Sequence, residues 1–227
     1  MAAFEFDDWF PLDDEDHQAQ VAGLLDLLAD GSKRILDIGC GDGRVLKPLA
    51  DAGHIALGLD TDPRAVEACA RKRLDASVGD ALDPDCDLTV HGAPPDAVLC
   101  LGHTFMLLTD PVAVLAMLAR IRGSLAGGGF FAIDAFCEPL WREVSEGYWQ
   151  SGVAEDGQSQ LVWAPGDNVL AFRGGDEIDE DSWEVKPTDR PMRLWSKGEL
   201  RLLARAAGFI EPEHRVTDCL IVMRAVR

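Results

Sequence analysis

The stretch that decides the fold is Ile35-Leu36-Asp37-Ile38-Gly39-Cys40-Gly41-Asp42-Gly43. A short apolar strand runs directly into three glycines at alternate positions, and residues 44–51 then have the pattern of a helix. Glycine adopts positive φ without strain and lets a ligand approach the backbone closely, and the first turn of a helix offers unpaired N–H groups. The pattern predicts a ligand-binding turn between a strand and a helix, although a tight turn without a ligand would need the same glycines.

An acid and the spacing of the glycines narrow the choice of ligand. Asp60 lies seventeen residues past Gly43, at the end of the apolar stretch 55–59, where a carboxylate can accept hydrogen bonds from both hydroxyls of a ribose. Dinucleotide enzymes use the spacing G-x-G-x-x-G to seat a pyrophosphate, whereas the glycines here alternate and follow Asp37. The Asp37 carboxylate would repel a pyrophosphate and attract an ammonium group. We therefore expect a ligand with a ribose and an amino acid tail.

Strand and helix patterns alternate through the first 135 residues. Helices are expected to begin at Asp62-Pro63 and Asp110-Pro111, where aspartate is a favourable N-cap and proline suits the first helical position. Such alternation indicates βαβ units and a mainly parallel sheet. The predicted strands are 34–38, 55–59, 76–79, 97–101 and 130–135, and further helices are predicted over 18–28 and 44–51.

Residues 136–195 depart from this alternation. The region is rich in tryptophan, and Pro165-Gly166-Asp167-Asn168 is a strong turn signal between two short β-like runs. We interpret it as a β-rich antiparallel insertion that covers the active site as a subdomain and offers a possible homodimer contact.

The regular pattern returns after the insertion. Ser196-Lys197-Gly198-Glu199 has the form of a capping box at the start of a helix. Strands over 209–216 and 219–226, joined by a turn at Thr217-Asp218, would close the sheet with an antiparallel hairpin. We expect one domain over 1–227, with residues 1–30 as an N-terminal helical lid.

The glycine turn resembles the first motif of the class I S-adenosylmethionine-dependent methyltransferases, and Val78-Gly79-Asp80-Ala81 resembles their third motif. The resemblance covers most of residues 33–135, together with 194–209. It implies a Rossmann-like α/β fold of seven strands with a C-terminal antiparallel hairpin. It also implies S-adenosylmethionine as the cofactor.

The resemblance assigns cofactor contacts to the carboxyl ends of the first four strands. Gly39, Cys40 and Gly41 would line the methionine portion, and Asp37 would face its ammonium group, often through water. Asp60 would hold the ribose, and Thr61 would lie beside the adenine. Asp80 would accept a hydrogen bond from the adenine amino group, Ala81 would supply a backbone N–H, and a carbonyl of Leu101 or Gly102 would bind the ammonium group.

The segment Leu101-Gly102-His103-Thr104-Phe105 is similar to the Leu-Gly-Asn-Ser-Phe of glycine and sarcosine N-methyltransferases, with His103-Thr104 in place of Asn-Ser. His103 is the first candidate for a catalytic base, because histidine titrates near neutral pH. A hydrogen-bonded structural histidine is the alternative. Asp134 is a second candidate base, or else a structural acid at the edge of the site.

Aromatic residues outside the motifs have two interpretations each. Trp141, Tyr148 and Trp149 would either wall an acceptor pocket or pack in the core of the insertion. Trp9 and Phe10 would either fold over the cofactor or plug the core.

Composition limits the partners. A formal charge of −19 disfavours nucleic acid, and the two short basic clusters, 71–73 and Arg201 with Arg205, suit solvated helix faces. The six cysteines show no metal-binding spacing, so we expect reduced thiols and no metal. No basic leader and no membrane-spanning run is present in this sequence, which indicates a cytoplasmic protein without membrane contact.

Three functions remain open at this point. Methyl transfer to nitrogen or oxygen of a small molecule is the leading hypothesis, and a protein acceptor is a variant of it. A nicotinamide-dependent oxidoreductase and a non-catalytic protein that binds S-adenosylmethionine are the alternatives.

Overall fold

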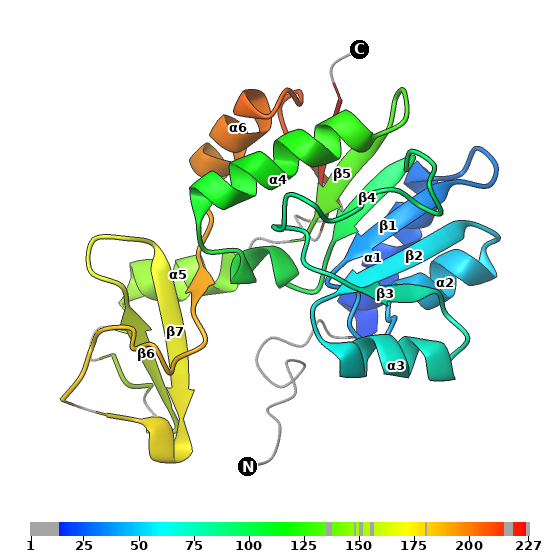
Figure 1. Cartoon of the computed structure of the whole chain (residues 1–227). Coiled ribbons are helices and arrows are strands. Elements are labelled where there is room, and N and C mark those ends of the chain that lie inside the picture. Colours follow the sequence, from blue (N-terminus) through cyan, green and yellow to red (C-terminus); the bar gives the residue numbers. More distant parts are fainter. Residues whose placement is uncertain are drawn as a thin grey trace.

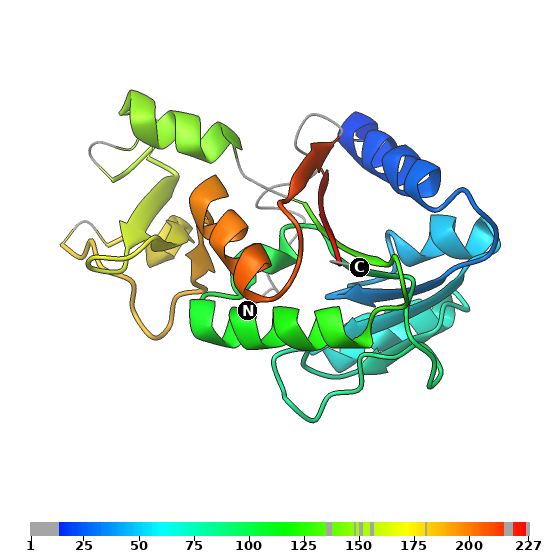
Figure 2. The same ribbon diagram turned by 90° about the horizontal axis from the view of Figure 1, so that it is seen from above.

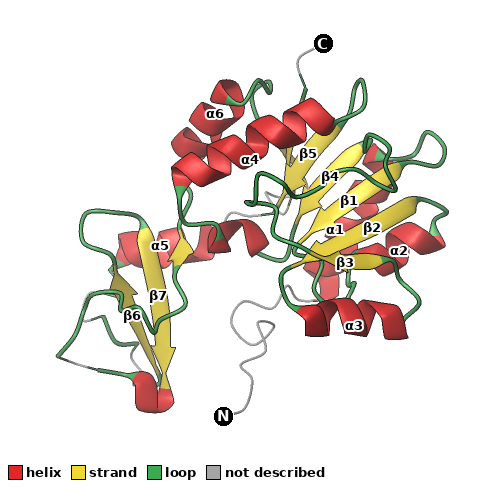
Figure 3. Ribbon diagram, in the orientation of Figure 1, coloured by secondary structure: helices red, strands yellow, loops and turns green. Residues whose placement is uncertain are grey.

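The computed structural model describes residues 14–134, 138–147, 149, 152–154, 157–179, 181–215 and 220–225. These residues form a seven-stranded sheet flanked by helices, and a smaller three-stranded sheet lies to one side (Figure 1). The two sheets are clearly separate in Figure 3.

The large sheet has the strand order β3-β2-β1-β4-β5-β10-β9. Its first five strands pair in parallel, whereas β10 pairs antiparallel with both β5 and β9. The order reverses between β1 and β4, and ligands of open α/β sheets bind at such a point, beyond the carboxyl ends of the strands. The strands are β1 Arg34–Ile38, β2 Ile55–Asp60, β3 Ala76–Val78, β4 Ala97–Cys100, β5 Phe130–Ile133, β9 Glu213–Arg215 and β10 Leu220–Arg224.

The caps predicted for three helices are present. Asp62 accepts a hydrogen bond from the Arg64 amide at 2.9 Å, and Asp110 accepts one from the Val112 amide at 2.8 Å. Ser196 begins the last helix with the predicted capping box. The helices around the large sheet are α1 Asp14–Leu27, α2 Leu46–Asp51, α3 Pro63–Arg71, α4 Pro111–Ser124 and α6 Lys197–Ala206.

The two faces of the large sheet bury different helices. Alternate residues of a strand point to opposite faces. Leu36 and Ile38 of β1 therefore pack in the core beneath α4 and α6, whereas Ile35 packs in the core with residues of α1 and α2. Figure 2 shows α1 and α4 on opposite sides of the sheet.

The insertion contains a helix as well as strands. It comprises α5 Glu138–Glu146, β6 Ser159–Trp163, β7 Val169–Gly174, a short 3-10 turn at Gly175–Glu177 and β8 Met192–Arg193. The turn predicted at 165–168 is present between β6 and β7, and β6, β7 and β8 pair antiparallel as predicted, whereas helix α5 was not predicted. Leu140 of α5 is buried against Leu161 and Leu170 of the two strands, so a helix covers the small sheet.

The insertion also has a buried polar centre. Arg173 of β7 is 2% exposed, and its guanidinium donates to both oxygens of Asp189 at 3.0 and 2.8 Å. It donates further to the Gln160 side chain and to the Ser182 and Glu184 carbonyls. This pair ties the long excursion between β7 and β8 to the small sheet.

Two predicted boundaries were wrong. The helix expected over 44–51 begins at Leu46, because Gly43 has a φ of +89° and its amide donates back to the Cys40 carbonyl, which makes a tight turn. The strand expected over 209–216 is reduced to Glu213–Arg215, and Phe209 makes an isolated bridge to Ala225. Pro212, which has no N–H to donate, separates the two pairings.

Some predictions fall outside the described residues. These are Trp9 and Phe10 of the N-terminal lid and the Thr217-Asp218 turn. The described part of that lid region, α1, packs on the sheet through the buried Leu24 and Leu28. No helix in the described ranges combines the length and the apolar character needed to cross a membrane.

Candidate functional site

The glycine turn after β1 is fastened to the end of β2. The Gly41 amide donates to Asp60 Oδ2 at 2.8 Å, and the Gly39 amide donates to the Leu59 carbonyl at 2.7 Å. Gly41 has a φ of +54°, and a Cβ added there would meet no atom within 4 Å. The turn therefore presents open backbone, as a cradle for a ligand requires.

Asp60 is half-buried and already organises the turn around it. Its second oxygen, Oδ1, accepts from the Asp62 amide at 2.9 Å. Because each carboxylate oxygen has two lone pairs, both oxygens keep capacity to accept from ligand hydroxyls.

The residues predicted beside an adenine lie at the same edge. The Gly79 amide donates to the Asp60 carbonyl at 2.9 Å, which brings the end of β3 next to the end of β2. Thr61 and Asp80 are exposed, and Ala81 is buried. Asp80 uses Oδ1 to accept from the Leu82 amide at 2.9 Å, so it caps its own turn and keeps Oδ2 for another donor.

The turn after β4 is held by Asp134 at the end of β5. Gly102 and His103 both have positive φ, at +67° and +59°. The Gly102 amide donates to Asp134 Oδ2, and the His103 amide donates to Oδ1 at 2.9 Å. With both oxygens accepting from this backbone, Asp134 is a structural anchor, which favours the second of its two predicted roles.

The turns after β1 and β4 touch each other. Thr104 donates through Oγ1 to the Leu101 carbonyl at 2.8 Å, so that carbonyl is already shared with the chain itself. The Thr104 methyl group occupies the space that a side chain at position 39 would need. The structure thus brings the predicted cofactor turn and the His103 turn into direct contact.

Buried carboxyl groups lie beneath these turns. Asp37 is 2% exposed and points to the α1 and α2 face of the sheet, as Ile35 does. Burial raises the pKa of Asp37 to about 7, although Arg44 acts against the rise, and the nearby carboxylates of Asp134 and Asp60 add to it. A cation that binds nearby would stabilise the ionised form of Asp37 and so lower its pKa.

A polar chain that the sequence analysis missed joins α1 to these turns. Arg44 Nη2 donates to Gln20 Oε1 at 3.1 Å, and Gln20 Nε2 donates to Asp134 Oδ2 at 3.3 Å. Arg44 Nη1 also lies 2.5 Å from His17 Nδ1. The sequence held one signal for this chain: Gln20 lies four residues before Leu24, so a polar residue occupies a position on the apolar side of the helix.

Two other predicted features are parts of the core. Cys40 is 5% exposed and its sulfur lies under the turn, where Gly58 leaves room for it, so the Cys40 backbone is the part that can face a ligand. Burial, followed by the Asp37 carboxyl, raises the pKa of its thiol.

Trp141 and Trp149 pack against the core of the insertion, and Trp149 Nε1 donates to Glu143 at 2.9 Å. Tyr148 lies outside the described residues.

The insertion contacts the segment that follows His103. Residues Thr104–Leu107 form the 3-10 helix η2, and Met106 of this helix packs in the core of the insertion. The Phe105 carbonyl accepts from Trp195 Nε1 at 3.1 Å, and the Thr109 carbonyl accepts from Arg193 at 3.1 Å. In Figure 1 the insertion lies on the side toward which the parallel strands point.

The thiols and acids of the described residues show no metal centre. Cys40, Cys69, Cys86 and Cys100 are free, and no group of three or more His, Cys, Asp or Glu in the described part of the chain is arranged to hold a metal ion. Cys137 and Cys219 lie outside it.

Comparison with known proteins identifies the domain. Residues 35–129 match the family model described as a methyltransferase domain. The cypemycin N-terminal methyltransferase of a Streptomyces species is 29% identical over 181 residues, which cover 78% of this chain and 72% of that protein.

Solved structures have the same fold. The sugar N-methyltransferase KedS8 from Streptoalloteichus sp has a TM-score of 0.61 and 20% identity, over 94% of this chain and 89% of its own. CalS10, an amino pentose methyltransferase from Micromonospora echinaspora with S-adenosylmethionine bound, has a TM-score of 0.57 and 21% identity, over 93% of this chain and 91% of its own.

These findings agree with the geometry of the site. The alternating glycines lie at the end of β1, next to the end of β2 where Asp60 accepts from Gly41. The match to a methyltransferase domain sets aside a nicotinamide-dependent oxidoreductase and a non-catalytic binding protein. Residues 35–129 are a methyltransferase domain, and the chain is an S-adenosylmethionine-dependent methyltransferase with the class I fold and S-adenosylmethionine as its cofactor.

Proposed function

We propose that this enzyme methylates the nitrogen of a small-molecule amine. The observation that carries the proposal is that relatives covering most of the chain are named for nitrogen methylation, for an N-terminus or for an amino sugar. They are a cypemycin N-terminal methyltransferase, a sugar N-methyltransferase and an amino pentose methyltransferase. The acidic chain, with a formal charge of −19, also favours the approach of a cationic amine over that of an anion.

The cofactor residues follow from the cradle. When bound, S-adenosylmethionine supplies a methyl group activated by a sulfonium. The turn of Gly39, Cys40 and Gly41, whose backbone is open at Gly41, would accommodate the methionine portion, and Asp37 would balance its ammonium charge. Leu101 and Gly102 would offer a backbone carbonyl to the same ammonium group.

The nucleoside portion would lie along the ends of β2 and β3. Asp60 would accept from the ribose hydroxyls with the lone pairs that the backbone leaves available. Thr61, the free oxygen of Asp80 and the Ala81 amide would lie beside the adenine.

His103 is the proposed base. An amine attacks as its free base, so an ammonium acceptor must lose one proton before the nitrogen–carbon bond forms and the sulfur–carbon bond breaks. In support of this role, the His103 amide donates to Asp134, and His103 precedes Thr104, which contacts the glycine turn. The turn after β4 would therefore contribute in two ways, by aligning the acceptor and by removing its proton through His103.

The acceptor can be identified by a labelled-methyl screen. Pools of small amines, amino sugars, alcohols and carboxylic acids would be incubated with enzyme and isotopically labelled cofactor, and the labelled carbon located by NMR. We expect label on nitrogen, and about a 100-fold lower rate for His103→Ala at pH 7. Label found on oxygen would reject the proposal while leaving the family intact.

A homodimer contact at the insertion and a cytoplasmic location stay predictions.

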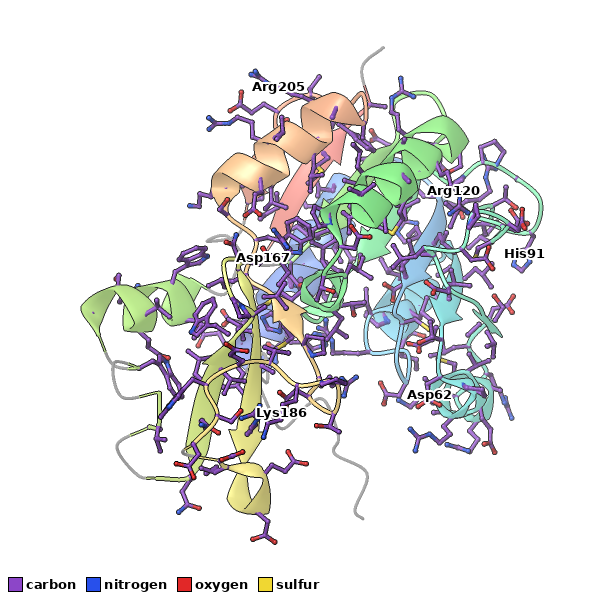
Figure 4. All side chains as sticks on the ribbon, turned by 60° about the vertical axis from the view of Figure 1, so that its left-hand side comes forward. Asp62, His91, Arg120, Asp167, Lys186 and Arg205 are labelled. Carbon is purple, nitrogen blue, oxygen red and sulfur yellow. The ribbon has the colours of Figure 1, made fainter. Side chains whose placement is uncertain are left out.

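The ribose assignment has its own test. Asp60→Ala should weaken binding of S-adenosylhomocysteine by about 1–3 kcal/mol in calorimetry, because buried ribose hydroxyls lose their acceptor. Asp62→Ala is the matched control, since the Asp62 carboxylate caps α3 and pairs with Arg64, and Figure 4 labels Asp62 at that helix. Equal affinities for both variants would refute the assignment.

A further inference from the structure

The chain Arg44–Gln20–Asp134 connects three elements that are distant in sequence. Gln20 belongs to α1, Arg44 follows the glycine turn, and Asp134 ends β5. Gln20 and Asp134 are 114 residues apart in sequence and are 0% and 3% exposed. A buried polar side chain requires hydrogen-bond partners, and here the partners are the two groups that border the transfer site.

The chemistry of an amide suits this place closely. The Gln20 carbonyl oxygen faces a guanidinium, which can only donate, and its NH₂ group faces a carboxylate, which can only accept. Apolar side chains of similar size would satisfy neither partner.

Asp134 transmits this contact to the backbone that carries His103. Its oxygen Oδ2 accepts both from Gln20 and from the Gly102 amide, and Oδ1 accepts from the His103 amide. Gly102 and His103 lie in the left-handed region, which a non-glycine residue adopts at a cost. The Asp134 carboxylate offsets that cost, and Gln20 is a further donor to it from α1.

We propose that Gln20 is a positioning residue for methyl transfer. From α1 it orients Asp134, which holds the Gly102–His103 turn against the glycine turn, and it links that assembly to Arg44. The role rests on the proposed placement of the acceptor at His103. It makes the first helix of the chain a part of the transfer site and not merely a cover of the sheet.

The first arm of the test needs no acceptor. Amide hydrogen exchange at Gly102 and His103 would be measured by NMR in wild type and in Gln20→Met, which keeps the length of the side chain but has neither a donor nor a comparable acceptor. We expect exchange at both amides to rise about tenfold, because the carboxylate that protects them loses its own anchor. Gln18→Met is the matched control, since Gln18 is exposed on the same helix.

The second arm separates positioning from cofactor binding. With the acceptor found in the amine screen, Gln20→Met should lower kcat by about 10- to 100-fold, because misplacement of a reacting group by a fraction of an ångström has effects of this size. Affinity for S-adenosylhomocysteine should change less than about threefold, since the Asp60 contacts remain. A purely structural role would instead lower stability and leave kcat per folded molecule unchanged.

A second variant guards against misfolding of the first. Gln20→Asn retains the amide but is one methylene too short to reach both Arg44 and Asp134, so it should show the same rise in exchange. Wild-type exchange at both amides in a folded Gln20 variant would overturn the proposal. The exchange arm decides this even if the screen finds methylation on oxygen, so the two failures are distinguishable.

Discussion

Asp37 in the site and Asp189 in the insertion both expose little of their side chains, yet their pKa values move in opposite directions. Hydrogen bonding to Arg173 lowers the pKa of Asp189 below its usual value. Burial raises the pKa of Asp37 to about 7, with the carboxylates of Asp134 and Asp60 adding to the rise. A guanidinium hydrogen-bonded to a carboxylate keeps it ionised, whereas burial without such a pair favours the protonated carboxyl group.

Breaking the pair in the insertion should have the largest effect on stability. Arg173→Met leaves the Asp189 carboxylate buried without its cation, which we expect to cost about 3–5 kcal/mol of the free energy of unfolding. Urea denaturation would measure it. Lys186→Met is the control, because the Lys186–Asp179 pair is exposed, at the surface of the insertion in Figure 4. That control should cost about 0–1 kcal/mol. Equal costs would show that burial of the Arg173 pair is not decisive.

Removing the ionisable group from the site should stabilise the protein at high pH. The folded pKa of Asp37, about 7, lies above its ordinary value of 3.8, so its protonated form favours folding at low pH. That contribution is lost as pH rises from about 4 to about 7. The free energy of unfolding of Asp37→Asn, relative to that of wild type, should therefore increase by about 2–3 kcal/mol as the pH rises from 5 to 8.

Urea unfolding at several pH values would test this gain. Asp42→Asn, in the same turn but exposed and paired with Lys72, should show no such trend. Asp189 titrates below its usual value, so its effect lies outside this pH range. Parallel stability curves for wild type and Asp37→Asn would contradict the raised pKa.

The smallest expected effect is on cofactor affinity. If the ligand ammonium faces Asp37, binding requires the carboxylate, so affinity for S-adenosylhomocysteine should rise by up to about tenfold per pH unit below pH 7 and then level off. Calorimetry in buffers of different ionisation enthalpy would detect the proton released. Asp37→Asn should bind more weakly, without this slope. A slope that survives in the variant would place the titrating group elsewhere.

The parts of the fold that were predicted correctly depend on short-range signals. Asp62, Asp110 and Ser196 cap helices through contacts within three residues, and the glycine turn is contiguous with its strand. The mainly parallel pairing follows from the alternation of strands and helices, and the antiparallel closing strands follow from the terminal hairpin. Each of these features is decided by neighbours along the chain, so a single sequence is enough to predict it.

The missed parts depend on tertiary contacts. Helix α5 has Leu140, Trp141 and Val144 on one face, but this apolar face favours a helix only because β6 and β7 pack against it. Gln20 and Arg44 gain their roles from Asp134, more than 80 residues away from either. The sequence shows that Gln20 is a polar residue at an apolar helix position, but it does not show which residues would be its hydrogen-bond partners.

The contact between Gly39 and Thr104 limits how the enzyme can be altered. Any side chain at position 39 would displace the Thr104 methyl group, and with it the η2 segment against which the insertion packs. The φ of +69° at Gly39 adds strain for any side chain there, so a smaller residue at 104 would not by itself make room for one. Libraries intended to broaden the range of acceptors should therefore keep glycine at position 39 and vary position 104.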